Sequence, residues 1–158
     1  MDDRSEIEEM KWALERQLGW IQSAEMKLTI LVPVPTAMLG ALLALVDRMP
    51  QMTWSVLVPF LASVFLLSGA LAFSGLSVVP RTDGPASSNI FFGRIVQTGA
   101  QEYNNMVASR SELEYLRDLT AQVHINAQIA TKKHVFVRRA TYCLFTAIAP
   151  WAATLYFA

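Results

Sequence analysis

Charge and cysteine are the scarce components of this sequence. Charged residues make up 16% of its 158 positions, whereas soluble domains average about 25%. The 13 basic and 13 acidic residues cancel, so no bulk attraction to nucleic acid is expected. The single cysteine, Cys143, excludes an internal disulfide framework and a multi-cysteine zinc site.

Catalytic motifs are missing as well. His124 and His134 are ten positions apart, which is roughly 280° around a helix, so they do not share a face as a metal-binding pair would. The sequence has no glycine-rich phosphate loop and no nucleophile elbow. We therefore predict a protein that is not an enzyme and that has no metal site and no cofactor.

The sequence instead contains three long windows without a charged residue. Charges are absent from residues 28–46, 51–80 and 140–158, and a helix that crosses a membrane needs about 20 apolar residues. The pattern predicts an all-α membrane protein with three transmembrane helices and a cytoplasmic helical bundle or stalk. A cleaved signal peptide is the alternative for the first window, but seven acidic residues precede Leu28, where such peptides have a short basic segment.

Basic residues predict the orientation of these helices. Four precede the first window, one lies in the first connection and eight lie between residues 81 and 139. Because basic residues favour the cytoplasmic side, the N-terminus is expected inside and the C-terminus outside. The expected segments are a cytoplasmic amphipathic helix at 1–27, a transmembrane helix at 28–46, an external turn at 47–53, a transmembrane helix at 54–79, a cytoplasmic loop and helical stalk at 80–139, and a transmembrane helix at 140–158.

The N-terminal segment has the pattern of an amphipathic helix. Ser5 to Glu8 has the form of a capping box, which predicts a helix start. Pro33 and Pro35 should bend the first span, because proline lacks a backbone donor. The apolar stripe of the helix comprises Ile7, Met10, Leu14, Leu18 and Ile21.

A second stripe precedes the third span. Neither glycine nor proline occurs between Ala100 and Pro150, so one helix is expected there, with a stalk at Ala100–Arg139 about 60 Å long. The two stripes can pair in one bundle or with another subunit, and we expect at least a dimer. The seam alternates spacings of three and four at positions 113, 116, 120, 123, 127, 130, 134 and 137.

Opposite charges flank the first and third spans, and we refer to these residues as the charge collar. The two sets would meet if they lie at the same level of the membrane, and anchoring to lipid headgroups is the alternative interpretation of the basic set. The charge collar comprises Glu25 and Lys27 before the first span, and Lys132, Lys133, Arg138 and Arg139 before the third.

A second polar set lies in the cytoplasmic segment. Arginine can hold a phosphate with two hydrogen bonds, while aspartate and glutamine can bind a base or a ribose. A salt-bridge network on the surface is the other interpretation of the same spacing. The candidate ligand-binding residues are Arg94, Arg117, Asp118 and Gln122, and Arg110 belongs to the same set.

Short motifs in a fixed order connect these features with one known family. They are Trp20-Ile21 followed by Ala24-Glu25-Met26-Lys27-Leu28, then Phe92-Gly93-Arg94-Ile95, then Glu102-Tyr103, and last Asp118-Leu119-Thr120-Ala121-Gln122 leading to Ala130-Thr131-Lys132-Lys133. Together with three spans, they make nearly the whole chain resemble the transmembrane effectors of Pycsar antiphage defence. That family pattern has aspartate at the position of Glu25 and alanine at that of Leu28.

The resemblance implies a bacterial inner-membrane protein with a cytoplasmic N-terminus and a periplasmic C-terminus. Its implied ligand is cyclic CMP or cyclic UMP, made by a partner pyrimidine cyclase after phage infection. The activated effector would impair the membrane and cause abortive infection, and its expected partners are the lipid bilayer, the nucleotide and further copies of itself, not nucleic acid. The alternatives are a related effector gated by cyclic oligonucleotides and a membrane scaffold or accessory subunit without a ligand.

Overall fold

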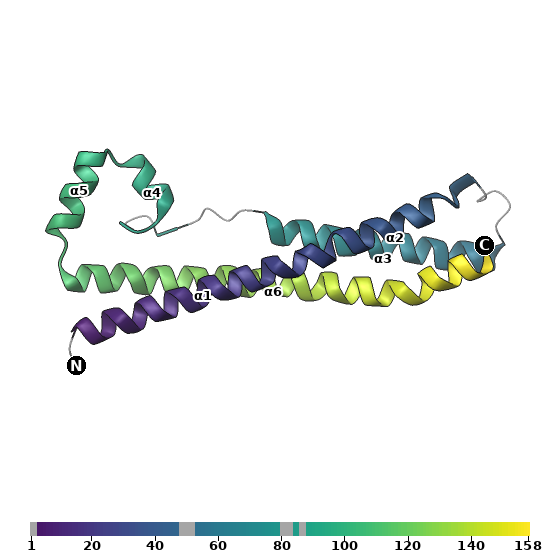
Figure 1. The fold of residues 1–158 in the computed structure, drawn as a ribbon, viewed down its shortest axis with the longest axis horizontal. Coiled ribbons are helices and arrows are strands. Elements are labelled where there is room, and N and C mark those ends of the chain that lie inside the picture. The colour runs from purple at the N-terminus through teal and green to yellow at the C-terminus, as the bar shows by residue number, and fades with distance from the viewer. Residues whose placement is uncertain (1–2, 48–52, 80–83, 86–87) are drawn as a thin grey trace. The chain divides into compact units, whose positions relative to one another are not determined.

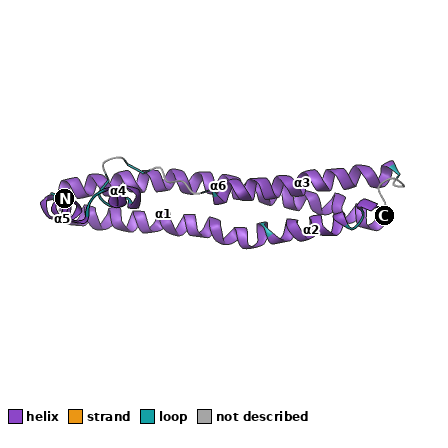
Figure 2. Ribbon diagram, turned by 90° about the horizontal axis from the view of Figure 1, so that it is seen from above, coloured by secondary structure: helices purple, strands orange, loops and turns teal. Residues whose placement is uncertain are grey.

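The computed structural model describes residues 3–47, 53–79, 84–85 and 88–158. Within these ranges the chain consists of helices and loops without a strand (Figure 1, Figure 2), which confirms the all-α fold class. Most of the predicted external turn at 47–53 lies outside the described residues. The helices are α1 (Asp3–Leu31), α2 (Pro33–Leu43), α3 (Trp54–Val78), α4 (Phe92–Gln97), α5 (Ala100–Ser109) and α6 (Glu112–Phe157).

Three helical stretches are long and apolar enough to cross a membrane, namely Arg4–Leu43, Trp54–Val78 and Glu112–Phe157. They cover residues 28–43, 54–78 and 140–157 of the three predicted spans, while the level at which lipid begins along each helix stays a prediction. The chain forms two compact units, and α1 and α6 contribute residues to both. Unit 1 comprises Met1–Ser23 and Pro80–Thr131, and unit 2 comprises Ala24–Val79 and Lys132–Ala158.

In unit 2, prolines divide the first span into two helices. A turn at Val32 separates α1 from α2, so the predicted bend is confirmed as a break. Pro35 has no N–H for the carbonyl of Leu31, four residues earlier. The hydroxyl of Ser74 on α3 donates to that carbonyl at 3.3 Å. Hydroxyl side chains of neighbouring helices often satisfy carbonyls that proline frees inside a membrane.

Small side chains bring the helices of unit 2 close together. Ala70 and Ala140 are fully buried, and small residues at such positions let membrane helices approach closely. Helix α2 packs along α3 (Figure 1), and the indole N–H of Trp151 on α6 donates to the carbonyl of Met38 on α2 at 3.1 Å. The buried core comprises Ala24, Leu28, Leu31, Leu42, Phe60, Leu67, Ala70, Val137, Ala140, Leu144 and Ala147.

Unit 1 buries few apolar side chains. Ile7, Leu119 and Ala130 are the buried hydrophobic residues in its described part. The Lys11 ammonium of α1 lies 5.9 Å from the centre of the Tyr115 ring of α6. Its two short helices, α4 and α5, have no buried residue. Hydrogen bonds between polar groups therefore have a large share in holding this unit together.

The predicted uninterrupted helix from Ala100 onward is wrong, because α5 ends at Ser109 and α6 begins at Glu112. Arg110 is extended, with φ −71° and ψ 131°. The Ser111 hydroxyl accepts from the N–H of Glu114 at 3.2 Å, and the Glu114 carboxylate accepts from the N–H of Ser111 at 2.9 Å. This reciprocal capping box starts a new helix without glycine or proline.

The N-terminal capping box was also wrongly placed. Helix α1 already runs from Asp3, so Ser5 lies inside the helix and does not start it. The Glu8 carboxylate accepts a hydrogen bond from the Lys11 ammonium at 2.7 Å. The pattern of serine followed by glutamate three residues later thus caps a helix at Ser111 but not at Ser5.

The predicted seam is correct at two positions and displaced by one residue at others. Ala130 and Val137 are buried as expected, but Leu113 is 52% exposed and Thr120 is exposed. Polar side chains occupy seam positions, because Gln122 and Lys133 are the buried residues where Val123 and His134 were expected. On α1, Leu18 is 50% exposed and lies outside the buried stripe.

Candidate functional site

A polar cavity of about 450 Å³ lies in unit 1, where α5 ends and α6 begins. Small-ligand sites commonly have volumes of about 300–1,000 Å³. Two arginines and two carboxylates line this cavity together, so it offers partners to a ligand that carries both a negative group and hydrogen-bond donors. The lining residues are Pro85, Asn89, Met106, Ser109, Arg110, Glu114, Arg117, Asp118 and Ala121.

One wall of the cavity belongs to residues 88–91, which we call the strap. The Asp118 carboxylate accepts from the backbone N–H of Asn89 at 2.8 Å, and the Gln122 amide donates to the Ser88 hydroxyl at 2.9 Å. The Tyr103 hydroxyl on α5 donates to the carbonyl of Asn89 at 3.1 Å. These bonds tie the strap to both helices that border the cavity.

Two glycines leave space for the ring of Phe91, the last residue of the strap. A Cβ added at Gly84 would lie 2.4 Å from Phe91 ring atoms, and one added at Gly93 would lie 2.6 Å from the ring. Real Cβ atoms do not approach other atoms this closely, so the Phe91 ring occupies space that side chains at either position would need. The ring also contacts Phe92, with 4.8 Å between ring centroids. Gly93 of the Phe92-Gly93-Arg94-Ile95 motif therefore leaves room for the Phe91 ring at the end of the strap.

Both arginines of the cavity lack an ion pair among the residues that the structure describes. The Arg110 guanidinium stacks on the Tyr115 ring, 4.0 Å from its centroid, so it is positioned by a contact that does not neutralise its charge. Arg117 lies in the second turn of α6. Unpaired guanidinium groups beside a cavity are suited to an anion such as a phosphate, which they can bind through two parallel hydrogen bonds.

The two carboxylates of the cavity have different surroundings. Hydrogen bonds from the backbone and hydroxyl of Ser111 lower the pKa of Glu114 from its ordinary value of 4.5, and the charges of Arg117 and Arg110 act in the same direction. Asp118 uses one oxygen for the strap, while its Oδ1 is buried without a hydrogen-bond partner in the described chain. That oxygen is an acceptor open to a donor if the cavity wall rearranges.

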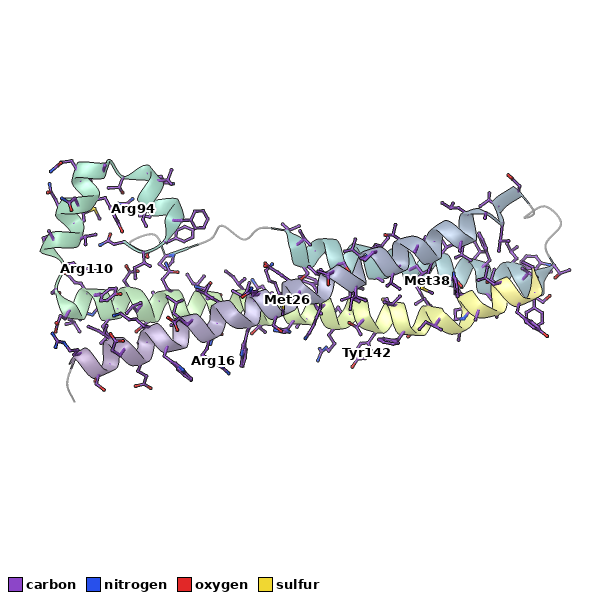
Figure 3. All side chains as sticks on the ribbon, in the orientation of Figure 1. Arg16, Met26, Met38, Arg94, Arg110 and Tyr142 are labelled. Atoms are coloured by element: carbon purple, nitrogen blue, oxygen red, sulfur yellow. The ribbon has the colours of Figure 1, made fainter. Side chains whose placement is uncertain are left out.

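The structure brings only some of the predicted ligand-binding residues together. Arg117 and Asp118 line the cavity, but Gln122 is 6% exposed and lies beneath the strap with Ser88. Arg94 is exposed on α4 and does not line the cavity, and Figure 3 places it apart from Arg110 at the junction of α5 and α6. The strap residues were not predicted as part of a site, since the sequence assigned them only to the cytoplasmic loop and helical stalk at 80–139.

The charge collar contains one close ion pair, between Lys133 and Glu25. Their nitrogen and oxygen atoms are 2.9 Å apart, and both residues belong to unit 2. Arg139 lies over the Phe73 ring at 5.8 Å. Lys27, Lys132 and Arg138 are exposed. Opposite charges of the collar therefore meet at one pair, and its contact with lipid headgroups stays a prediction.

These features define a helical membrane protein with three helices able to cross a bilayer and a ligand-sized polar cavity in a separate helical unit. The family model of the Pycsar effector protein domain matches residues 9–158, so the chain belongs to that family. It is a membrane effector of Pycsar antiphage defence, a system in which the effector acts with a pyrimidine cyclase. No curated protein and no solved structure matches the chain.

Proposed function

We propose that the chain responds to a cyclic pyrimidine mononucleotide, cyclic CMP or cyclic UMP, and then impairs the bacterial inner membrane, which leads to abortive infection. Membership of the Pycsar effector family supports the class of signal. The observation that carries the proposal is the cavity with two arginines that have no ion pair in the described chain. Such a site fits a ligand with one negative charge and a polar ring system.

Within the cavity, Arg110 and Arg117 bind the cyclic phosphate, which carries a single negative charge. The carboxylates of Glu114 and Asp118 accept hydrogen bonds from the base or the ribose hydroxyl, because ionised carboxylates are acceptors only. Gln122 acts indirectly by holding Ser88 in the strap. A volume of about 450 Å³ favours a mononucleotide over a cyclic oligonucleotide, which has at least twice as many atoms.

Helix α6 provides a route from ligand to membrane. It is continuous from Glu112 to Phe157, so one helix contributes cavity residues in its first turns and the third span at its end. A ligand shifts an equilibrium only by its different affinity for the two states, and a change from 1:99 to 99:1 takes about 5.5 kcal/mol. The nucleotide therefore favours one packing of α5, the strap and α6 over another.

The membrane that this effector acts on is the inner membrane, with the N-terminus in the cytoplasm and the C-terminus in the periplasm. This orientation places the cavity on the side where a cyclase makes its product, and a C-terminal phosphatase fusion that is active in the periplasm checks it. We also propose self-association, because α1 exposes large apolar side chains, and mass measurement in detergent checks this. These side chains are Trp12, Leu18 and Trp20.

Titration of the purified protein with cyclic nucleotides tests the proposed ligand. Cyclic CMP or cyclic UMP should bind, and Arg117→Gln should weaken binding about tenfold or more, which is about 1.4 kcal/mol. Arg94→Gln is the matched control, because Arg94 is an exposed arginine of the same unit outside the cavity. Equal losses in both variants would contradict the cavity as the binding site.

The same titration separates the alternatives. Binding of cyclic oligonucleotides in place of cyclic mononucleotides would identify the chain as an effector for another class of synthase. If no cyclic nucleotide binds or raises the unfolding temperature of the folded protein, a scaffold or accessory role replaces the proposed one, since a specific ligand stabilises the state that binds it.

A further inference from the structure

A lysine is buried inside unit 2, whose other buried residues, among those described, carry no charge. Lys133 is 6% exposed and occupies a seam position of α6 between Ala130 and Val137, which are also buried. A buried charge is costly unless it is paired and hydrogen-bonded. A charged residue occupies this position, although an apolar one would match Ala130 and Val137, the buried seam residues before and after it.

The ammonium group of Lys133 links three helices. It donates to the Glu25 carboxylate of α1 at 2.9 Å and to the backbone carbonyl of Ser77 at 2.9 Å. Ser77 lies in the last turn of α3, where carbonyl groups lack partners within the helix and the helix dipole attracts a positive charge. The Lys133 side chain of α6 thus contacts α1 through the ion pair with Glu25, and it contacts the C-terminal end of α3 through the Ser77 carbonyl.

These contacts are better suited to specifying a packing than to stabilising the fold. A buried ion pair often contributes no more than apolar residues of the same volume, whereas an unpaired buried charge is strongly unfavourable. The packing that satisfies Lys133 is therefore favoured over any that would separate it from its partners. Glu25 is 53% exposed, so water reaches one member of the pair and the contact can open.

The packing that Lys133 holds surrounds a cluster of buried apolar residues, which includes the fully buried Leu67, Ala70, Ala140 and Ala147. The other buried side chains of unit 2 include small hydroxyl residues such as Ser74 and Thr154. A state that disrupts the bilayer needs a different arrangement of these helices. We propose that Lys133 is a positioning residue that locks α1, α3 and α6 in the sealed packing, and that membrane activity requires its contacts with Glu25 and Ser77 to break.

Dye release from vesicles tests the lock. The inference rests on the membrane-impairing part of the proposed function but not on the ligand, so the lock is measured without nucleotide. The full-length protein is reconstituted into vesicles of phosphatidylethanolamine and phosphatidylglycerol that contain a fluorescent dye. Lys133→Met should raise the rate of nucleotide-free release about tenfold, corresponding to about 1.4 kcal/mol in the equilibrium between packings.

Three further variants distinguish the lock from general damage. Lys132→Met removes a neighbouring exposed lysine and should leave release unchanged. Lys133→Arg keeps the positive charge and the hydrogen-bond donors, so its rate of dye release should equal that of the wild-type protein. Glu25→Gln changes a side chain that is half exposed, so it is expected to fold even if Lys133→Met does not, and it should raise release in the same direction.

Two results would overturn the lock. The first is a folded Glu25→Gln variant that releases dye no faster than the wild-type protein. The second is a Lys133→Met variant that releases dye at the same rate as Lys132→Met. Adding cyclic CMP or cyclic UMP to wild-type vesicles is a separate measurement, which judges the proposed ligand alone. Leaking Lys133 and Glu25 variants together with a nucleotide-insensitive wild type would support the lock and reject the ligand.

Discussion

The two units differ in what fills their interiors. Unit 2 contains a contiguous apolar core together with buried hydroxyl groups such as Ser74 and Thr154, whereas the described part of unit 1 buries few apolar residues and places Ser88 and Gln122 in its interior. Apolar packing is the sum of many weak contacts, but a wall held by hydrogen bonds changes when one partner is removed. We therefore expect the proposed ligand to rearrange unit 1 by binding a few polar groups, and the proposed lock at Lys133 to hold unit 2 until its contacts break.

Both units expose large apolar side chains, and Trp12 and Trp20 are examples in unit 1. Unit 2 exposes large aromatic and aliphatic side chains such as Phe65 and Phe145, at 78% and 66%, which suits contact with lipid. Trp54 begins α3 and Tyr156 lies near the end of α6, at 79% and 83% exposed. Aromatic residues at span ends commonly sit at the membrane interface. The exposed apolar side chains of unit 2 therefore suit the expected contact with lipid, whereas those of α1 suit the proposed self-association.

Removing a core side chain from unit 2 should have the largest effect on stability. Leu67→Ala deletes a fully buried side chain, and such changes cost about 2–5 kcal/mol. Thermal unfolding in detergent, followed by circular dichroism, measures the loss. Leu61→Ala on the same helix is the control, since Leu61 is 52% exposed. A similar fall for both variants would show that unit 2 lacks the tight core described above.

Ser88→Ala should loosen the strap with a smaller effect on the whole protein. The Ser88 hydroxyl accepts from the N–H groups of Ile90 and Phe91 at 3.1 and 3.0 Å, and from Gln122. Loss of a buried acceptor costs about 1–3 kcal/mol, so amide exchange at Ile90 and Phe91 should accelerate about tenfold or more.

The control for the strap is Thr120→Ala. Thr120 is exposed and its hydroxyl donates to the Leu116 carbonyl of its own helix, so its removal should leave exchange at Ile90 and Phe91 unchanged. If Ser88→Ala accelerates exchange no more than this control does, hydrogen bonding does not hold the cavity wall, and the contrast between the two units is weaker than inferred.

The seam shows what the sequence could predict about the fold. The three spans followed from uncharged windows because lipid excludes charges over a length set by its thickness. The register of the seam did not follow, because apolar periodicity assigns Val123 and His134 to positions that Gln122 and Lys133 occupy. Their partners, Ser88 and Glu25, are 34 and 108 residues away, and no local pattern reveals such pairs.

The candidate site was predictable in its chemistry but not in its construction. Arg117 and Asp118 were identified because their side chains suit a nucleotide, and both line the cavity. Arg94 has the same chemistry, but it lies on α4, whose position the sequence did not disclose. The absence of glycine and proline did not predict the break at Arg110, because the capping box of Ser111 and Glu114 starts a new helix without either residue.

The smallest predicted effect concerns that capping box and its dependence on pH. Hydrogen bonds from Ser111 lower the pKa of Glu114 below its ordinary 4.5. Because the folded value lies below the unfolded one, the stabilisation is complete above the unfolded pKa and is lost as pH falls through the folded value. The first turn of α6 should therefore fray below about pH 4.5, while the core of unit 2 stays unchanged.

Exchange of the backbone amides of Ser111 and Glu114, corrected for the intrinsic effect of pH, measures this fraying. Glu114→Gln is the control, because glutamine can accept the same bonds but does not titrate in this range. The variant should show a turn that is somewhat more open at neutral pH and insensitive to acid. If acid accelerates exchange equally in the wild type and the variant, a group other than Glu114 controls the junction of α5 and α6. The capping box then does not account for the start of α6 beside the cavity.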